Sequence, residues 1–133
     1  MAAVLLGPFA GAIVISVVLA VQMLFFGDGG LVAIGANIVN MALIGSLASY
    51  YIYYFLRKIL PKTTSVMIAA WCSVMLAALA CSLQIGLSGT ISLDRIVPAM
   101  LKAHVVIGIA EAFITIAGIY AFNAMTGKTA KEE

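Results

Sequence analysis

Long apolar stretches separated by short polar breaks dominate the chain from end to end. The stretches cover residues 4–26, 31–56, 64–87 and 103–125. Each is longer than the ~20 residues that an α-helix needs to cross a bilayer, and none shows the alternation of a barrel strand. Because lipid offers no partner for a backbone amide, hydrogen bonds must close within each segment, which favours helix. The pattern predicts an all-α fold, a polytopic membrane helical bundle with about four transmembrane helices, in a single integral membrane domain over residues 1–133.

The breaks between the stretches carry residues that are typical of turns. Gly27-Asp28-Gly29-Gly30 separates the first two stretches, and a basic segment over 57–62 separates the next two. The longest expected connection covers residues 88–102. Gly7-Pro8 interrupts the first stretch, and proline suits the first turn of a helix. We therefore expect the first long helix to begin near Pro8, with residues 1–6 as the end of another element.

Composition excludes several classes of protein. Of the 133 residues, 65% are hydrophobic and 9% are charged, whereas an ordinary soluble domain has about 25% charged residues. Such a chain cannot cover a water-facing surface with polar groups, so a soluble globular enzyme and a disordered chain are both excluded. The net charge is only +2 and the basic residues are scattered, which gives no electrostatic footprint for nucleic acid.

The distribution of lysine and arginine predicts the orientation in the cell (inner) membrane. The side that holds both termini carries Arg57, Lys58, Lys62, Lys128 and Lys131, whereas the opposite side carries Arg95 and Lys102. Tyr50, Tyr51, Tyr53 and Tyr54 precede the basic break, as expected for an aromatic belt at an interface. We therefore expect a multi-pass protein with both termini in the cytoplasm.

Small residues recur every four positions along the third stretch, at Ser65, Ala69, Ser73, Ala77 and Cys81. Such rows let helix backbones approach closely in lipid. They fit packing within the bundle or contact with another membrane subunit, and the pattern does not separate the two. Cys72 and Cys81 face opposite directions on one predicted helix, so we expect no disulfide between them.

The fourth stretch contains two ionisable residues on one helix face, His104 and Glu111. An ionisable group in a membrane helix is costly and normally faces the bundle interior or a wet cavity. Glu111 fits either a structural hydrogen-bond anchor or a residue that lines a polar site. His104, the only histidine, fits either an interfacial residue near the outer end of its helix or a metal contact. It is the only candidate metal ligand that the sequence offers.

Two amides and one carboxylate stand in or beside the second stretch. Asn37 and Asn40 share a helix face and need hydrogen-bond partners in lipid. The two amides fit either of two roles: hydrogen bonding between helices, or support of the ligands of a bound cation. Asp28, between glycines, fits either a cap on the second helix or a group that attracts cations to the mouth of a site.

Several catalytic motifs are absent from the sequence. It contains no phosphate-binding Gly-x-x-x-x-Gly-Lys-Ser/Thr loop, no cluster of cysteine or histidine, and no Gly-x-Ser-x-Gly nucleophile motif. We therefore expect that the chain is not an enzyme and binds no cofactor covalently.

Four blocks of the sequence resemble one family of membrane transport proteins. The blocks are residues 6–11 (Leu-Gly-Pro-Phe-Ala-Gly), 22–30 (Gln-Met-Leu-Phe-Phe-Gly-Asp-Gly-Gly), 35–41 (Gly-Ala-Asn-Ile-Val-Asn-Met) and 104–115. In this order they resemble the CbiM/NikM family, the substrate-capture membrane subunits of energy-coupling-factor transporters for cobalt and nickel. The resemblance implies uptake of Co²⁺ or Ni²⁺ as transported substrate, as needed for cobalamin biosynthesis in the case of cobalt. It also implies a transmembrane coupling subunit and two cytoplasmic ATPase subunits as partners.

The chain departs from the family pattern at its start. The family has about seven helices and holds its metal mainly through an N-terminal Met-His segment and a histidine upstream of the Gly-Pro block. This chain begins Met1-Ala2-Ala3, and the Gly-Pro block follows at once. The resemblance therefore covers the C-terminal portion of the family, and no primary metal ligand carries over. We expect metal capture to need the missing N-terminal segment, which a separate chain could also supply.

Four residues match family motif positions: Asn37, Asn40, His104 and Glu111. We expect them, with Asp28 at the mouth, to line the substrate pathway or to support ligands that come from elsewhere. Two other functions remain open on the sequence alone. One is a membrane assembly or structural subunit that transports nothing, and the other is a capture subunit for another small solute.

Overall fold

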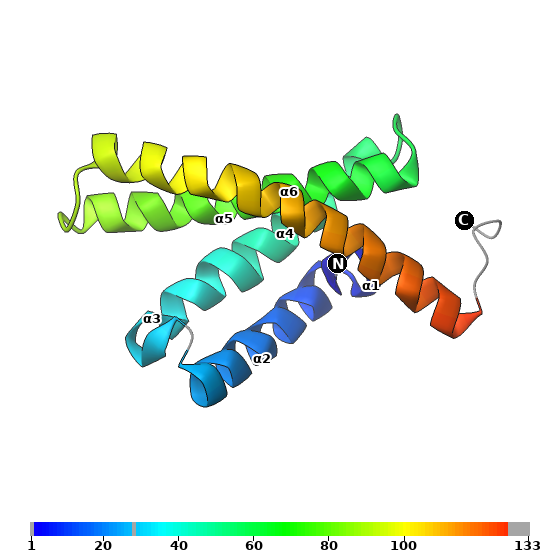
Figure 1. Cartoon of the computed structure of the whole chain (residues 1–133), viewed down its shortest axis with the longest axis horizontal. Helices are drawn as coiled ribbons and strands as arrows, with labels where there is room; N and C mark the ends of the chain where they lie inside the picture. Colours follow the sequence, from blue (N-terminus) through cyan, green and yellow to red (C-terminus); the bar gives the residue numbers. More distant parts are fainter. Residues whose placement is uncertain (1, 28, 128–133) are drawn as a thin grey trace.

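The computed structural model describes residues 2–27 and 29–127, and in this part of the chain it is entirely helical, with turns and no strand. Four helical rods are long and apolar enough to cross a membrane: Pro8–Phe26, Gly30–Leu56, Lys62–Leu87 and Leu93–Thr126. Figure 1 shows the first two rods lying together and the last two crossing them. The predicted all-α membrane bundle of four spans is therefore confirmed.

The first apolar stretch is divided into two helices at Gly7. The short helix α1 covers Ala2–Leu6, and α2 covers Pro8–Phe26 with proline in its first turn. Gly7 has a backbone φ of 89°, which residues other than glycine rarely adopt. The chain can therefore change direction at this residue. The helix α1 packs against α2 and against α4 (Gly45–Leu56). The prediction that the first long helix begins near Pro8 is confirmed.

The second rod changes its helical geometry in the middle. It consists of α3 (Gly30–Asn37), a π-helical segment η1 (Ile38–Ile44) and α4. At the end of η1 the Gly45 amide donates to the carbonyls of Ala42 and Asn40, which lie three and five residues earlier, and not to the carbonyl four residues earlier. Such π-helical turns are rare and often occur at functional sites, because they turn side chains away from regular α-helical directions.

The fourth helix begins earlier than the sequence predicts. The helix α6 covers Leu93–Thr126, so the connection after α5 (Lys62–Leu87) is only residues 88–92 and not 88–102. The amides of Arg95 and Ile96 donate to the carbonyl of Ser92. The helix therefore begins within the polar segment that the sequence predicts as the connection. Pro98 lies inside the helix, where it removes one hydrogen bond without ending the helix.

This correction also moves His104. It lies well inside α6, so its placement near the outer end of a helix was wrong. Figure 1 shows α6 lying along α5 at its start and leaning away from it toward its C-terminal end. There the hydroxyls of Tyr120 and Thr63 are still 3.5 Å apart.

The core of the bundle consists largely of small side chains. Ala42, Ala69, Ser65 and Ser82 are 0% exposed, and Val66 is the largest fully buried residue. In lipid, where apolar side chains gain little from leaving the solvent, such residues let backbones pack closely. The buried members of the predicted small-residue row therefore serve packing within the molecule. Both cysteines are free, as expected.

Candidate functional site

A central pocket of about 450 Å³ lies where the helices meet. Residues from α1 to α6 and from η1 line it. Its polar lining consists of Asn37, Asn40, Ser46, Ser49, Ser73, His104, Glu111 and Thr115. Polar side chains are scarce in this chain, and their collection around one cavity marks the central pocket as the candidate site.

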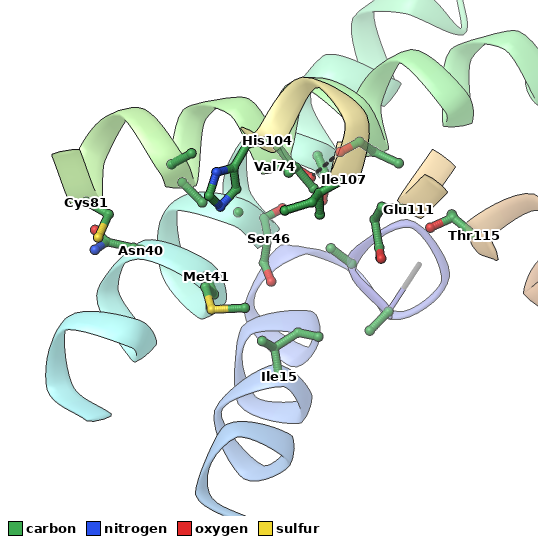
Figure 2. A pocket seen from close by; sticks show the side chains of 18 of the residues that line it. Ile15, Asn40, Met41, Ser46, Val74, Cys81, His104, Ile107, Glu111 and Thr115 are labelled. Carbon is green, nitrogen blue, oxygen red and sulfur yellow. Dashed lines mark hydrogen bonds between the residues drawn. The ribbon is translucent and has the colours of Figure 1, made fainter. Parts of the chain in front are cut away.

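The imidazole of His104 is oriented by its own helix. Its Nδ1 lies 2.7 Å from the carbonyl oxygen of Met100. Because a carbonyl can only accept, Nδ1 carries a proton, and in a neutral ring the lone pair is then on Nε2. Figure 2 shows the ring in the pocket between Asn40 and Ser46. A second ring nitrogen anchored to a carbonyl is the usual arrangement of a histidine that binds a metal through the other nitrogen.

Asn40 forms a reciprocal amide pair with Gln84 of α5. The Nδ2 of Asn40 donates to Oε1 of Gln84 at 2.9 Å, and the Nε2 of Gln84 donates to Oδ1 of Asn40 at 2.8 Å. Asn40 is only 3% exposed, so this pair satisfies an amide that lipid could not. Of the two roles open to Asn40, interhelical hydrogen bonding is the one that the structure shows.

Gln84 was not singled out from the sequence. The pair spans 44 residues, and no local spacing connects a glutamine near the end of one span with an asparagine in the middle of another. The available signal was weaker: a lone amide in an apolar span needs a partner.

Asn37 also borders the pocket, so the shared face predicted for the two asparagines is confirmed. Its side-chain nitrogen lies against Gly29 at the start of the same rod, where any β-carbon would collide with it. Asp28, the predicted cap or cation-attracting residue, lies outside the described residues.

Glu111 and Thr115 lie one helical turn apart on α6, and both border the pocket. Within the described part of the chain, Glu111 makes no hydrogen bond or ion pair. Thr115 is 3% exposed, and its Oγ1 has no hydrogen-bond partner within residues 2–27 and 29–127. Figure 2 shows the carboxylate and the hydroxyl on the same side of the pocket, away from Cys81 and Asn40.

The structure thus brings Asn37, Asn40, His104 and Glu111 to one pocket. It also adds Ser46, Ser49 and Thr115, whose small hydroxyls carry little signal in an apolar sequence. Among the described residues there is no group of three histidine, cysteine or acidic side chains placed to hold a metal. The described residues that line the pocket therefore do not form a complete primary ligand set.

Four apolar helical rods surround a pocket whose mainly apolar lining includes eight polar side chains, and their length and composition are those of an integral membrane protein. The chain belongs to the CbiM family, because residues 1–128 match its "Cobalt uptake substrate-specific transmembrane region". The resemblance noted in the sequence is therefore confirmed.

Curated relatives are about one third identical to this chain over the aligned residues. It is 37% identical over 126 residues to a putative fused nickel transport protein NikMN of Archaeoglobus fulgidus, covering 93% of this chain and 42% of that protein. It is 30% identical to the cobalt transport protein CbiM of Moorella thermoacetica, covering 98% of this chain and 58% of the relative. The chain thus spans about half the length of these curated relatives.

Two crystal structures share the fold. One is described as a truncated transition metal transporter and the other as a transition metal transporter. Both superpose with a TM-score of 0.84, at 35% and 36% sequence identity. Each comparison covers 92% of this chain, with 64% of the first structure and 61% of the second.

Proposed function

We propose that this chain is a membrane component of a cobalt or nickel uptake transporter of the energy-coupling-factor type. The observation that carries the proposal is a central pocket that gathers polar side chains, among them an anchored histidine, inside a membrane domain of the CbiM family. Relatives named as nickel and cobalt transport proteins support Ni²⁺ or Co²⁺ as the transported substrate. The role is transport and not catalysis, with the whole chain acting as one membrane domain.

The proposed mechanism divides metal capture between this chain and an N-terminal segment outside it. The cation enters from the outer side past Asp28. Its primary ligands come from the additional segment, because the described residues offer only one imidazole and no complete ligand group. His104, Glu111, Asn37 and Asn40 then support those ligands and line the path.

We propose that both termini face the cytoplasm. Supporting this orientation, the cluster of aromatic residues before the second break forms a stacked group, with Tyr50 and Tyr54 rings 6.5 Å apart. The ammonium of Lys58 lies 4.6 Å from the centre of the Tyr54 ring. Aromatic and basic side chains grouped in this way are typical of a membrane interface, and the basic bias places it on the cytoplasmic side.

The proposed partners are a transmembrane coupling subunit and two cytoplasmic ATPase subunits. They would supply the energy that this chain does not provide, since it has no nucleotide-binding loop. A separate chain could supply the metal-binding segment. Two relatives are named fused nickel transport proteins, which supports the association of such a membrane region with further transport components.

Calorimetry tests the division of labour. The 133-residue chain and a longer form with the upstream segment of a relative fused to it are each titrated with Ni²⁺ and Co²⁺ in lipid nanodiscs. We expect tight binding only by the longer form. Equally tight binding by the short chain would contradict the proposal.

Uptake of radioactive nickel and cobalt tests the function itself. Cells that lack the gene are compared with cells in which it is restored. We expect the deletion to reduce uptake and restoration to recover it. Unchanged uptake would favour a structural subunit, and an organic solute found by mass spectrometry in the purified protein would favour a different substrate.

A further inference from the structure

The Glu111 side of the central pocket contains two oxygen-bearing side chains whose bonding is incomplete. Glu111 has no hydrogen-bond or ion-pair partner among the described residues. Thr115 is almost fully buried, and its hydroxyl has no hydrogen-bond partner in the part of the chain that the structure describes. A carboxylate in a membrane span is costly unless it is paired, and a buried hydroxyl is costly unless it is hydrogen bonded. Glu111 is exposed in the structure, so its carboxylate is open to an incoming ion, and an ion bound there would also offer the buried Thr115 hydroxyl a partner.

Other hydroxyl side chains in the bundle form a hydrogen bond to the backbone, which Thr115 does not form. Ser16, Ser65 and Ser82 donate to the carbonyl four residues earlier on their own helices, at 2.8, 3.0 and 2.9 Å. Thr115 makes no such bond. Its hydroxyl is therefore available to the pocket, where it lies beside Glu111 (Figure 2).

His104 lies on the same helix as Glu111 but closer to its N-terminus, toward the connection between α5 and α6. It is separated from Glu111 by two turns of α6, or about 10 Å along the helix axis at 1.5 Å per residue. Its available donor is a nitrogen, Nε2, because Nδ1 is bonded to Met100. Along the axis of α6 the pocket therefore presents first an imidazole nitrogen, from His104, and about 10 Å further the oxygen atoms of Glu111 and Thr115.

We infer that Glu111 and Thr115 form a second cation station, which receives the transported divalent ion after His104. The inference rests on the proposed function, because that function supplies the ion and the direction of travel. With the C-terminal end of α6 in the cytoplasm, Glu111 is the inner of the two levels. The ligand is a partly hydrated Co²⁺ or Ni²⁺ ion, since both accept nitrogen and oxygen donors.

The charge of this station suits passage rather than storage. A single carboxylate neutralises half of a divalent charge, so the ion keeps water ligands and is held weakly. Movement through a membrane protein needs sites that bind well enough to receive an ion and weakly enough to release it. A weak station that follows the site of tight capture meets this condition, because it can receive the ion and then release it.

Binding of Co²⁺ to the 133-residue chain in lipid nanodiscs tests the station directly. Visible absorption of the bound ion reports whether nitrogen or only oxygen atoms coordinate it. We expect Glu111→Gln to weaken binding about 10-fold or more, and Thr115→Val to weaken it by a smaller factor, while Thr115→Ser stays near wild type. His104→Gln should remove the nitrogen contribution to the spectrum and leave the oxygen contribution that Glu111 provides.

Asp94→Asn is the matched control, because Asp94 is a carboxylate in the first turn of the same helix and does not line the pocket. It should bind Co²⁺ like wild type. Wild-type affinity of Glu111→Gln would overturn the station, and so would equal weakening by Thr115→Val and Thr115→Ser, which would indicate a packing effect. Circular dichroism and size-exclusion chromatography verify that each variant is folded.

The two proposals fail in different ways. If the station is wrong, Glu111→Gln binds Co²⁺ normally even where cells take up the metal. If the proposed function is wrong, cells show no dependence of metal uptake on the chain, whatever the purified variants bind.

Discussion

At the scale of single residues, the amide pair between Asn40 and Gln84 is the clearest polar contact between spans. Each side chain donates one hydrogen bond to the other and accepts one from it, so the amide nitrogen and the amide oxygen of both residues have a partner. The two residues differ in burial, because Asn40 is 3% exposed and Gln84 is exposed at the bundle surface. The consequences of losing one partner should therefore differ.

We expect Gln84→Leu to destabilise the fold more than Asn40→Leu does. The first change leaves a buried amide unpaired, at a cost of about 1–3 kcal/mol, whereas the second leaves an amide that can reach water or lipid head groups. The double variant should show a coupling energy of about 0.5–2 kcal/mol. Unfolding in mixed detergent, followed by the fluorescence of the single tryptophan, measures each value. Strict additivity of the two single changes would show that the pair contributes nothing.

Residue-level features could be predicted where they depend on spacing along one helix. His104 and Glu111 are seven apart, and the structure places both on the pocket. The partner of Asn40 could not be predicted, since it depends on how two separate rods pack. The free hydroxyl of Thr115 could not be predicted either, because a threonine in a helix usually bonds to its own backbone.

At the scale of elements, the close approach of α1 to α2 depends on one glycine. A β-carbon at Gly11 would lie 2.5 Å from Cα and 2.7 Å from N of Ala3, so the backbone of α1 occupies the space of a side chain. Because α1 also lines the central pocket, its position affects the site as well as the packing.

We expect Gly11→Ala to destabilise the protein by about 1–3 kcal/mol through overpacking, or to displace α1. Gly35→Ala is the control, because a β-carbon there meets no atom within 4 Å and alanine favours helix over glycine. Unfolding midpoints of the two variants in the same detergent mixture decide the comparison. A Gly11→Ala midpoint at or above that of Gly35→Ala would contradict the role of this contact.

The start of α6 shows why element boundaries were harder to predict than elements. Residues 93–102 include Asp94, Arg95, Pro98 and Lys102, which in sequence indicate a connection. In the structure the same residues are the first turns of a long helix, and Leu93 packs over Gly86 of α5. Tertiary contact with α5 therefore outweighs a polar local sequence, and only the apolar parts of the rods were predictable from the sequence.

At the scale of the whole molecule, the orientation in the membrane depends on which connections carry positive charge. The connection between α4 and α5 contains Ile59, which is 78% exposed, and the connection between α5 and α6 contains the exposed Thr90. These positions lie on opposite sides of the bilayer in any arrangement with four spans, so each can report its side.

We expect Thr90→Cys to react with a membrane-impermeant maleimide in intact cells, and Ile59→Cys to react only after the membrane is opened. Both changes are made in a background where Cys72 and Cys81 are replaced by serine, since the protein's own thiols are free. The positive-inside bias is the physical reason for this pattern. Reaction of the Ile59→Cys variant alone in intact cells would place both termini outside.

The π-helical segment has a consequence for changes in chain length. In a π-helix the backbone hydrogen bond joins residues five apart, whereas in an α-helix it joins residues four apart. The bond from the Gly45 amide to the Asn40 carbonyl is of the π type. Deleting one residue within Ile38–Ile44 would restore ordinary α pairing and keep α3 and α4 in their present registers. The same deletion in α5 would rotate the remaining half of that helix by about 100°. The second rod is thus the one membrane-spanning helix here that could lose a residue during evolution and keep its packing, at the expense of the direction in which Asn40 points.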